Sequence, residues 1–133
     1  MKSAVEPLTE GGTETILVAE DDERLRSLSE IVLTQNGYKV ILAQNGEEAI
    51  EKFLANKERI QLLLLDMIMP KKSGIEVYEE IKSIKPDTKV IFVSGYTADR
   101  MNKEILAEKH VNFIFKPVSP KDLLRRIRDV LDN

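Results

Sequence analysis

The sequence predicts an α/β domain in which a parallel β-sheet carries helices on both faces. Short, mainly apolar runs alternate along the chain with longer segments whose apolar residues recur at helical spacing. This alternation is typical of parallel strands joined by right-handed helical crossovers. At 133 residues, the chain has the length of a single domain.

Five apolar runs are the predicted strands of this sheet. The three runs that end before Glu20, Asp66 and Ser94 are almost wholly apolar, as interior parallel strands are. The second run contains Lys39, which is typical of an edge strand. These compositions favour a doubly wound sheet of order 2-1-3-4-5, built from residues 15–19, 38–42, 61–65, 90–93 and 113–115.

The first predicted helix lies between the first two strands, over residues 22–36. Leu25, Leu28 and Val32 lie on one stripe of this helix, which is the spacing of an amphipathic helix. Gly37 follows as a C-terminal stop.

Four further helices are predicted from start signals that precede helical segments. The second helix begins with a variant of the capping box at residues 45–48, and Pro120 occupies the first helical position of the last helix. A fourth helix is predicted from Thr97 or Asp99 to Glu108. The remaining N-caps are Ser73 and Ser119, and the stripes contain Ala49, Ile50, Phe53 and Leu54, then Val77, Ile81 and Ile84, and finally Leu123, Leu124, Ile127, Val130 and Leu131.

The N-terminal fourteen residues differ from the rest of the chain. Residues 1–14 contain Pro7 and the Gly11-Gly12 pair but few side chains that a core would bury, so we expect a flexible lead-in. The domain itself is expected to occupy residues 15–133.

The composition excludes several classes of function. The chain has 20 Lys+Arg and 23 Asp+Glu, so a net charge of −3 argues against binding nucleic acid or an anionic membrane by bulk charge. The absence of cysteine excludes disulfides and thiol catalysis, and it fits a cytoplasmic location. The apolar runs are far shorter than the roughly 20 residues that span a bilayer, so no membrane contact is expected. The arginines at 125, 126 and 128 are expected on the solvent face of the last helix.

Polar side chains follow the predicted strands at one edge of the sheet. Asp66 ends a run of four leucines, where an ionised carboxylate is costly unless a cation, a donor or a metal compensates it. Glu20 and Asp21 follow the first strand, Ser94 follows the fourth and Lys116 follows the last. In the order 2-1-3-4-5, strands 1 and 3 meet at the switch point, where the binding crevice lies. The sequence therefore predicts a site for a divalent cation and a phosphoryl group.

The charges at this edge favour Mg²⁺ as the cation. With Glu20, Asp21 and Asp66 ionised and Lys116 protonated, the formal sum is −2, which one Mg²⁺ neutralises. Mg²⁺ keeps several waters, so a few carboxylates, a backbone carbonyl and a phosphate oxygen suffice as ligands. We expect Asp66 to attack a phosphoryl group in line, and the product is then an acyl phosphate.

Four motifs in this order resemble the receiver domain of two-component response regulators, over about residues 15–131. The resemblance implies a flavodoxin-like (βα)5 domain in a phosphorelay, which takes a phosphoryl group from the phosphohistidine of a histidine kinase. The motifs are Ile-Leu-Val-Ala-Glu-Asp-Asp at 16–22, Leu-Asp-Met-Ile-Met-Pro at 65–70 with Gly74, Val-Ser-Gly-Tyr at 93–96 and Phe-Lys-Pro at 115–117.

The same resemblance implies the ligands of the metal. Asp66 is then the phosphoacceptor and also a Mg²⁺ ligand, Glu20 and Asp21 form the acidic pair, and the backbone carbonyl of Ile68 completes the protein ligands. Glu20 stands where the family more often has aspartate. Its extra methylene leaves two alternatives open, a direct contact with the metal or one through water.

The resemblance also implies the residues of a conformational switch. Ser94 and Lys116 hold the family's hydroxyl and lysine positions, and the bond from Lys116 to Pro117 is expected to be cis. Phe113 holds the switch-aromatic position in place of tyrosine, so a switch here works by packing. The signal is expected on the face of helix 4, strand 5 and helix 5, over about residues 98–131.

The partners follow from this interpretation. A histidine kinase domain, in cis or in trans, is expected to supply the phosphoryl group, and a histidine phosphotransfer protein is a further candidate. Because the sequence stops two residues after Leu131, output is expected by contact with partners. A stand-alone regulator and a C-terminal receiver of a hybrid sensor kinase both remain open, and the motifs around Ser94 and Lys116 favour the hybrid kinase.

Two other classes of function remain as alternatives. We expect no enzymatic turnover beyond the domain's own phosphorylation and dephosphorylation. A metal-dependent aspartyl phosphohydrolase normally has a second aspartate two residues after the nucleophile, where this chain has Ile68. A pseudo-receiver that only docks partners has no need of the acidic pair, Asp66 and Lys116.

Overall fold

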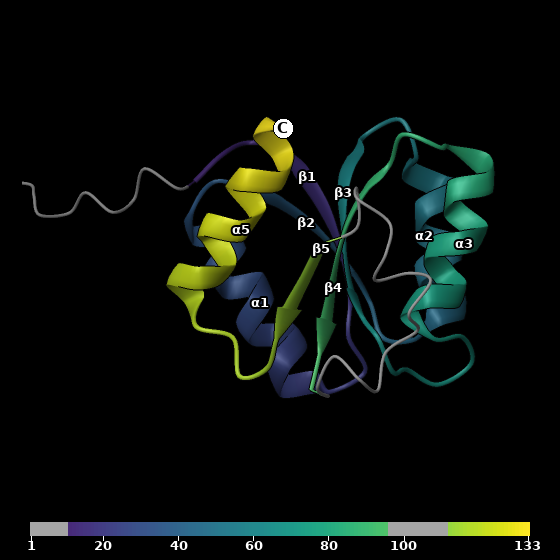
Figure 1. The fold of residues 1–133 in the computed structure, drawn as a ribbon, viewed down its shortest axis with the longest axis horizontal. Helices are drawn as coiled ribbons and strands as arrows, with labels where there is room; N and C mark the ends of the chain where they lie inside the picture. Colours follow the sequence, from purple (N-terminus) through teal and green to yellow (C-terminus); the bar gives the residue numbers. More distant parts are fainter. Residues whose placement is uncertain (1–10, 96–111) are drawn as a thin grey trace, which may run out of the picture.

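The computed structural model describes residues 11–95 and 112–133, which form one parallel β-sheet between two layers of helices (Figure 1). The strand order is β2-β1-β3-β4-β5, so the predicted fold class and strand order are confirmed. The strands are β1 (Thr15–Ala19), β2 (Lys39–Ala43), β3 (Ile60–Asp66), β4 (Lys89–Ser94) and β5 (Asn112–Phe115).

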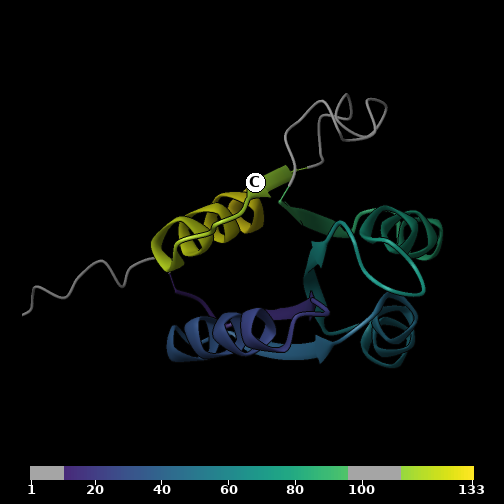
Figure 2. The same ribbon diagram turned by 90° about the horizontal axis from the view of Figure 1, so that it is seen from below.

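The described helices cover both faces of the sheet, as the view along the layers shows (Figure 2). Helices α1 (Glu23–Gln35) and α5 (Pro120–Asp132) lie on one face, and α2 (Gly46–Asn56) and α3 (Gly74–Ile84) lie on the other. The predicted fourth helix, from Thr97 or Asp99 to Glu108, lies outside the described residues. Among the described helices, none combines the length and the apolar character that crossing a membrane requires.

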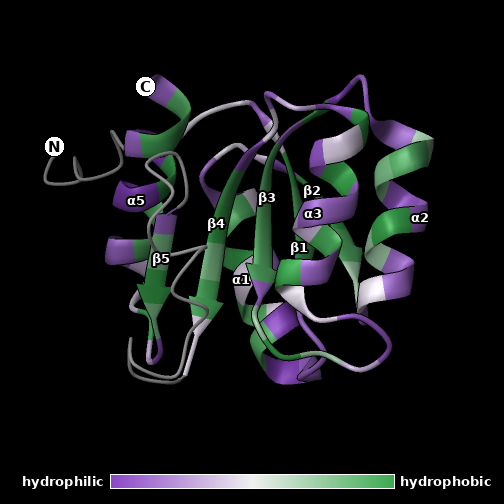
Figure 3. Cartoon of the chain, turned by 45° about the vertical axis from the view of Figure 1, so that its right-hand side comes forward, coloured by the Kyte–Doolittle hydropathy of each residue, from purple (hydrophilic) through white to green (hydrophobic). Residues whose placement is uncertain are grey.

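The leucine run of β3 supplies both hydrophobic cores, which explains why it does not alternate with polar residues. Leu63 and Leu65 pack with α2 and α3, whereas Leu62 and Leu64 pack with α1 and α5. Successive side chains of a strand point to opposite faces, so a strand covered on both sides is apolar throughout. The central strands are accordingly hydrophobic along their length (Figure 3).

Side-chain caps fix the starts of the helices. Ser73 and Glu76 form a complete capping box at α3, and Ser119 caps α5 by accepting from the N–H of Asp122. The expected capping box of α2 differs in its second half. Asn45 accepts from the N–H of Glu48 at 2.8 Å, but the Glu48 carboxylate accepts from the N–H of Gln44 at 2.6 Å.

The apolar stripe of α1 is more exposed than its spacing suggests. Leu33 is fully buried against the sheet, but Leu25 and Leu28 keep 39% and 48% of their surface exposed. These two leucines, with Val32, line a groove between α1 and α5. The stripe therefore faces α5 across this groove, and Leu33, at the edge of the stripe, reaches the core.

Arg128 of α5 ties the last helix to the residues that precede β1. Its guanidinium donates to the Glu14 carboxylate at 2.7 Å, to the Gly11 carbonyl and the Tyr38 hydroxyl at 3.2 Å, and to Asp132 at 2.8 Å. Arg125 and Arg126 are exposed as expected, whereas Arg128 keeps only 21% of its side chain exposed. The domain start at Thr15 remains a prediction, and residues 11–14 contact α5 through this arginine.

We predict that Lys71→Gly stabilises the protein. Lys71 has a φ of 75°, a conformation that costs a non-glycine residue about 1 to 2 kcal/mol. Glycine removes this strain at an entropic cost of about 0.5 to 1 kcal/mol. The ion pair of Lys71 with Glu47 spans 4.0 Å between exposed side chains and contributes little. Urea denaturation should show a net gain of about 0.5 to 1 kcal/mol.

The control is Lys72→Gly, in the same loop. Lys72 is not among the described residues with positive φ, so glycine there relieves no strain and should lower the free energy of unfolding. A loss of stability in Lys71→Gly, equal to that in Lys72→Gly, would contradict the prediction.

Candidate functional site

Three carboxylates meet at the carboxyl ends of the two central strands. Asp66 is the last residue of β3, and Glu20 and Asp21 follow β1, which pairs directly with β3. Each of the three offers a carboxylate oxygen that lies within 4.8 Å of the other two. The structure thus brings together the three acidic residues that the sequence placed at this edge.

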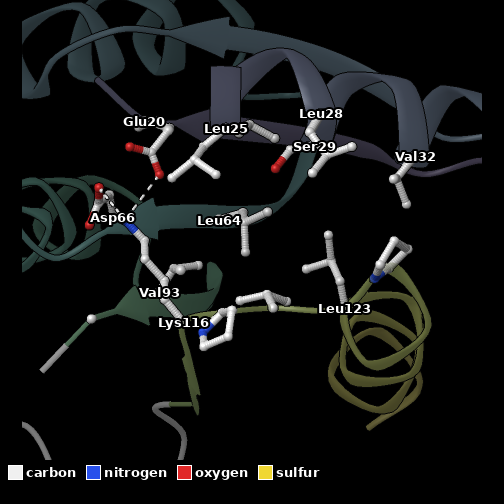
Figure 4. A pocket seen from close by; sticks show the side chains of 16 residues that line it. Glu20, Leu25, Leu28, Ser29, Val32, Leu64, Asp66, Val93, Lys116 and Leu123 are labelled. Atoms are coloured by element: carbon white, nitrogen blue, oxygen red, sulfur yellow. Dashed lines mark hydrogen bonds and ion pairs between the residues drawn. The ribbon is translucent and has the colours of Figure 1, made fainter. Parts of the chain in front are cut away.

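Lys116 follows the edge strand β5, and its side chain extends to these carboxylates. Its Nζ lies 3.2 Å from Asp66 Oδ2 and 3.5 Å from Glu20 Oε1 (Figure 4). The peptide bond between Lys116 and Pro117 is cis, as expected. The backbone N–H of Lys116 donates to the Ser94 carbonyl at 2.8 Å, which joins the end of β5 to the end of β4.

Burial and a neighbouring carboxylate raise the proton affinity of Glu20. Glu20 and Asp66 each keep only 6% of their surface exposed, while Asp21 is exposed. Burial, together with the neighbouring Asp66 carboxylate, raises the pKa of Glu20 from 4.5 to about 7. Burial disfavours the charge of Lys116, but Asp66 and Glu20 outweigh it, so the pKa of Lys116 is raised. Lys116 thus compensates the Glu20 and Asp66 carboxylates only in part.

The backbone around Asp66 is fixed from two sides. The N–H of Ile68 donates to Asp66 Oδ1 at 3.3 Å, and the N–H of Gly74 donates to the Met67 carbonyl at 3.0 Å. A Cβ at Gly74 would meet the carbonyl oxygen of Asp66, so only glycine permits this approach of α3 to the strand end. The side chain of Ile68 is 55% exposed beside the carboxylates.

The acidic loop after β1 has an equally defined backbone. The N–H of Glu20 donates to the Ala43 carbonyl at 3.1 Å, and the Glu20 carboxylate accepts from the N–H of Asp22 at 3.1 Å. Asp22 caps α1 by accepting from Arg24 and Leu25. The Arg26 guanidinium donates to the Glu20 carbonyl at 2.8 Å, a contact that none of the sequence motifs indicated. The sequence feature that could have indicated this contact is an arginine about one helical turn after the acidic pair.

The two expected switch residues, Ser94 and Phe113, lie on the neighbouring strands β4 and β5. Ser94 ends β4 and is 2% exposed. Phe113 on β5 packs against Phe92 of β4, with ring centroids 5.5 Å apart. Phe92 in turn contacts Tyr78 of α3 edge to face at 5.6 Å. Phe113 is therefore part of the packing between strands β4 and β5 and helix α3.

An apolar groove opens onto the charged cluster. It encloses about 490 Å³ between α1 and α5, and Glu20, Asp66 and Lys116 form its polar end. Leu25, Leu28 and Val32 of α1 line one wall, and Leu123 of α5 lines the other (Figure 4). A second, polar pocket of about 480 Å³ contains the three carboxylates and Ile68. Asp66 thus borders both a polar pocket and an apolar groove.

The residues present fit a hard divalent cation. The three carboxylates offer oxygen ligands, and their negative charge exceeds the positive charge of Lys116, which contacts two of them. Mg²⁺ and Ca²⁺ both prefer such oxygen ligands, and Mg²⁺ needs few of them from the protein.

The family of the chain is shown by comparison with known proteins. The model of the response regulator receiver domain matches residues 16–128. The chain belongs to this family of two-component receiver domains. CpdR, a response regulator receiver protein of Brucella abortus, is 34% identical over 116 residues, which cover 87% of this chain and 95% of CpdR.

Other relatives place receiver domains in different settings. The sensor kinase CckA of Brucella abortus is 32% identical over 91% of this chain, and the matched part is 13% of that kinase. The response regulator TrrA of Thermotoga maritima, solved in complex with Mg²⁺ and beryllium fluoride, superposes with a TM-score of 0.77 at 32% identity. The match covers 88% of this chain and 98% of TrrA. The receiver domain is therefore similar both to proteins of its own length and to a short part of a much longer kinase.

We predict that Glu20→Gln alters the pH dependence of stability. Glu20 holds its proton more tightly in the folded protein than in the unfolded chain, so the free energy of unfolding of the metal-free receiver falls as the pH rises from about 4.5 to about 7. Glutamine does not titrate, and the decline should flatten in the variant. Urea denaturation in EDTA between pH 5 and 7.5 measures both slopes. Equal slopes in the two proteins would contradict the raised pKa of Glu20.

Proposed function

We propose that the receiver takes a phosphoryl group onto Asp66 from a phosphohistidine, with Mg²⁺ as cofactor. The observation that carries this proposal is the buried Asp66 carboxylate at a central strand end, within 4.8 Å of two further carboxylates and 3.2 Å from Lys116. In the transfer, an Asp66 oxygen attacks phosphorus, the bond from phosphorus to the imidazole nitrogen breaks, and that nitrogen keeps the electron pair. The product is an aspartyl phosphate.

Each side chain of the cluster has a defined part in this chemistry. Glu20, Asp21, Asp66 and the Ile68 carbonyl would hold Mg²⁺, which supplies positive charge to the phosphoryl oxygens. Lys116 already contacts Asp66 and carries a second positive charge to the same place. The Ile68 N–H holds one Asp66 oxygen and so orients the carboxylate. TrrA, which was solved with Mg²⁺ and beryllium fluoride, supports this cofactor.

The same features weigh against the two alternatives. A phosphohydrolase needs an acid or base near the nucleophile, and Ile68 fills that position with an exposed apolar side chain. A pseudo-receiver has no use for three crowded carboxylates, and burial of Glu20 beside the Asp66 carboxylate raises the pKa of Glu20 in the folded protein. The proposed receiver therefore stores a phosphoryl group and turns over no other substrate.

The apolar groove is the proposed contact for a protein donor. A phosphohistidine must come within bonding distance of Asp66, so its carrier covers the surface beside this residue. That surface includes the exposed Leu25 and Leu28 of α1, which lie at the mouth of the groove. A histidine kinase domain or a histidine phosphotransfer protein with an apolar face around its histidine fits these features.

Phosphorylation is proposed to act through Ser94 and Phe113. The added charge attracts donors, and the Ser94 hydroxyl and Lys116 are its neighbours at the strand ends. Movement of Phe113 requires a change in its contact with Phe92, so the signal reaches the surface of β5 and α5 by packing. The remaining part of this face, the predicted fourth helix, lies outside the described residues.

A hybrid sensor kinase is the proposed setting of this receiver, in the cytoplasm. The likeness to part of the CckA kinase supports it, and CpdR shows that the stand-alone arrangement also occurs among relatives. The reading frame upstream of Met1 tests this proposal. A frame that continues into a kinase domain supports a hybrid kinase, and an in-frame stop before Met1 contradicts it.

We predict that acetyl phosphate and Mg²⁺ add one phosphoryl mass to the receiver and none to Asp66→Asn. Asparagine keeps the size of the side chain but lacks the nucleophilic carboxylate oxygen. Intact-protein mass spectrometry measures the gain, with EDTA as the metal-free control. Lys116→Met should lower the initial rate at least tenfold because it removes the cation 3.2 Å from Asp66. A phosphoryl group on Asp66→Asn would overturn the assignment.

We predict that Leu28→Glu slows transfer from a phosphohistidine protein about tenfold while leaving transfer from acetyl phosphate unchanged. A charge on the groove wall weakens docking of an apolar partner surface, and tenfold corresponds to about 1.4 kcal/mol. The matched control is Leu54→Glu on α2, since Leu54 is also 48% exposed but lies on the other helical layer. Equal rates for the two variants would exclude the groove as the docking surface.

A further inference from the structure

We propose that Arg26 is a positioning residue for the metal site, which holds the backbone of the acidic pair so that its carboxylates face the cation. The inference rests on the proposed function, because it concerns the Mg²⁺ site of the phosphoacceptor. Arg26 belongs to α1 and contacts no carboxylate oxygen in any described interaction. Its effect is therefore exerted through the backbone of the loop.

The contacts of Arg26 are directed at both residues of the acidic pair. Nη1 donates to the Glu20 carbonyl at 2.8 Å and lies 3.4 Å from the Asp21 carbonyl, which makes the second bond the weaker one. The side chain is half-buried, so these bonds are partly shielded from water. A planar guanidinium can bridge two neighbouring carbonyls, and a lysine ammonium has no such fixed geometry.

Arg26 completes a closed set of hydrogen bonds around the loop. Asp22 accepts from the first turn of α1, and its own N–H donates to the Glu20 carboxylate. The N–H of Arg26 donates to the Asp22 carbonyl at 2.9 Å, and its guanidinium then returns to Glu20 and Asp21. The carbonyls are thus turned toward α1. The Glu20 and Asp21 carboxylates are left at the metal cluster.

The positive charge of Arg26 allows its positioning role to be distinguished from a direct electrostatic effect on Mg²⁺ binding. A guanidinium beside a cation site repels Mg²⁺, so removing its charge alone should tighten Mg²⁺ binding. If Arg26 positions the ligands, removing it should weaken Mg²⁺ binding despite the lost repulsion. Arg24 provides the comparison because its charge acts on Asp22, the residue after the acidic pair, and its side chain is exposed on the same helical turn.

The experiment is a calorimetric Mg²⁺ titration of the full chain and of three variants, Arg26→Met, Arg26→Lys and Arg24→Met. Methionine keeps an unbranched apolar stem and removes the donors. We expect Arg26→Met to weaken Mg²⁺ binding at least fivefold and Arg26→Lys to weaken it two- to threefold. Arg24→Met should bind as tightly as the wild type or more tightly. Thermal unfolding in EDTA reports the stability of each variant separately.

The outcomes distinguish this inference from the proposed function. If the wild type binds Mg²⁺ and is phosphorylated, but Arg26→Met binds Mg²⁺ as tightly or more tightly, the positioning role is wrong and the phosphoacceptor function stands. If the wild type neither binds Mg²⁺ nor gains a phosphoryl group, the proposed function fails first. Should Arg26→Met not fold, Arg26→Lys decides. A lysine variant with wild-type affinity overturns the role, and a two- to threefold loss supports it.

Discussion

The architecture of this receiver depends on a carboxylate that the fold buries at the end of its central strand. The leucines of β3 serve two cores at once, so the strand cannot end elsewhere without exposing them, and Asp66 is carried to a site with 6% exposure. Burial of charge requires compensation. Lys116, which follows β5, and the Ile68 N–H supply part of it, while Glu20 and Asp21 add further negative charge. The excess of negative charge that remains makes the site suitable for a cation.

The arrangement of the strands determines which residues can take part. Strands β1 and β3 are neighbours, and their loops diverge to opposite faces of the sheet, which leaves space above their ends. The space is bordered by the first turn of α1 on one side and by the loop before α3 on the other. Gly74 and Arg26 both shape this space, because Gly74 places no side chain near the Asp66 carbonyl and Arg26 anchors the loop of the acidic pair.

Sequence reasoning reached the fold and the members of the cluster because their signals are local. Apolar runs, caps and the polar residues at strand ends are visible without tertiary information, and Glu20, Asp66 and Lys116 were found from them. The exposure of Leu28 and the contacts of Arg128 were not found. Both depend on how far α5 lies from its neighbours, and a helical stripe has the same spacing whether it faces a core or a groove. The roles of Ser94 and Phe113 remain predictions.

The hydrogen bond from the Lys116 N–H to the Ser94 carbonyl links two loops that begin on different strands. Any displacement of the lysine backbone toward Asp66 stretches this bond or drags the end of β4 along with it. The backbones of the serine and the lysine therefore form one mechanical unit, because neither can shift alone while this bond is intact. A force on either strand end is thus shared between β4 and β5 for as long as this bond holds.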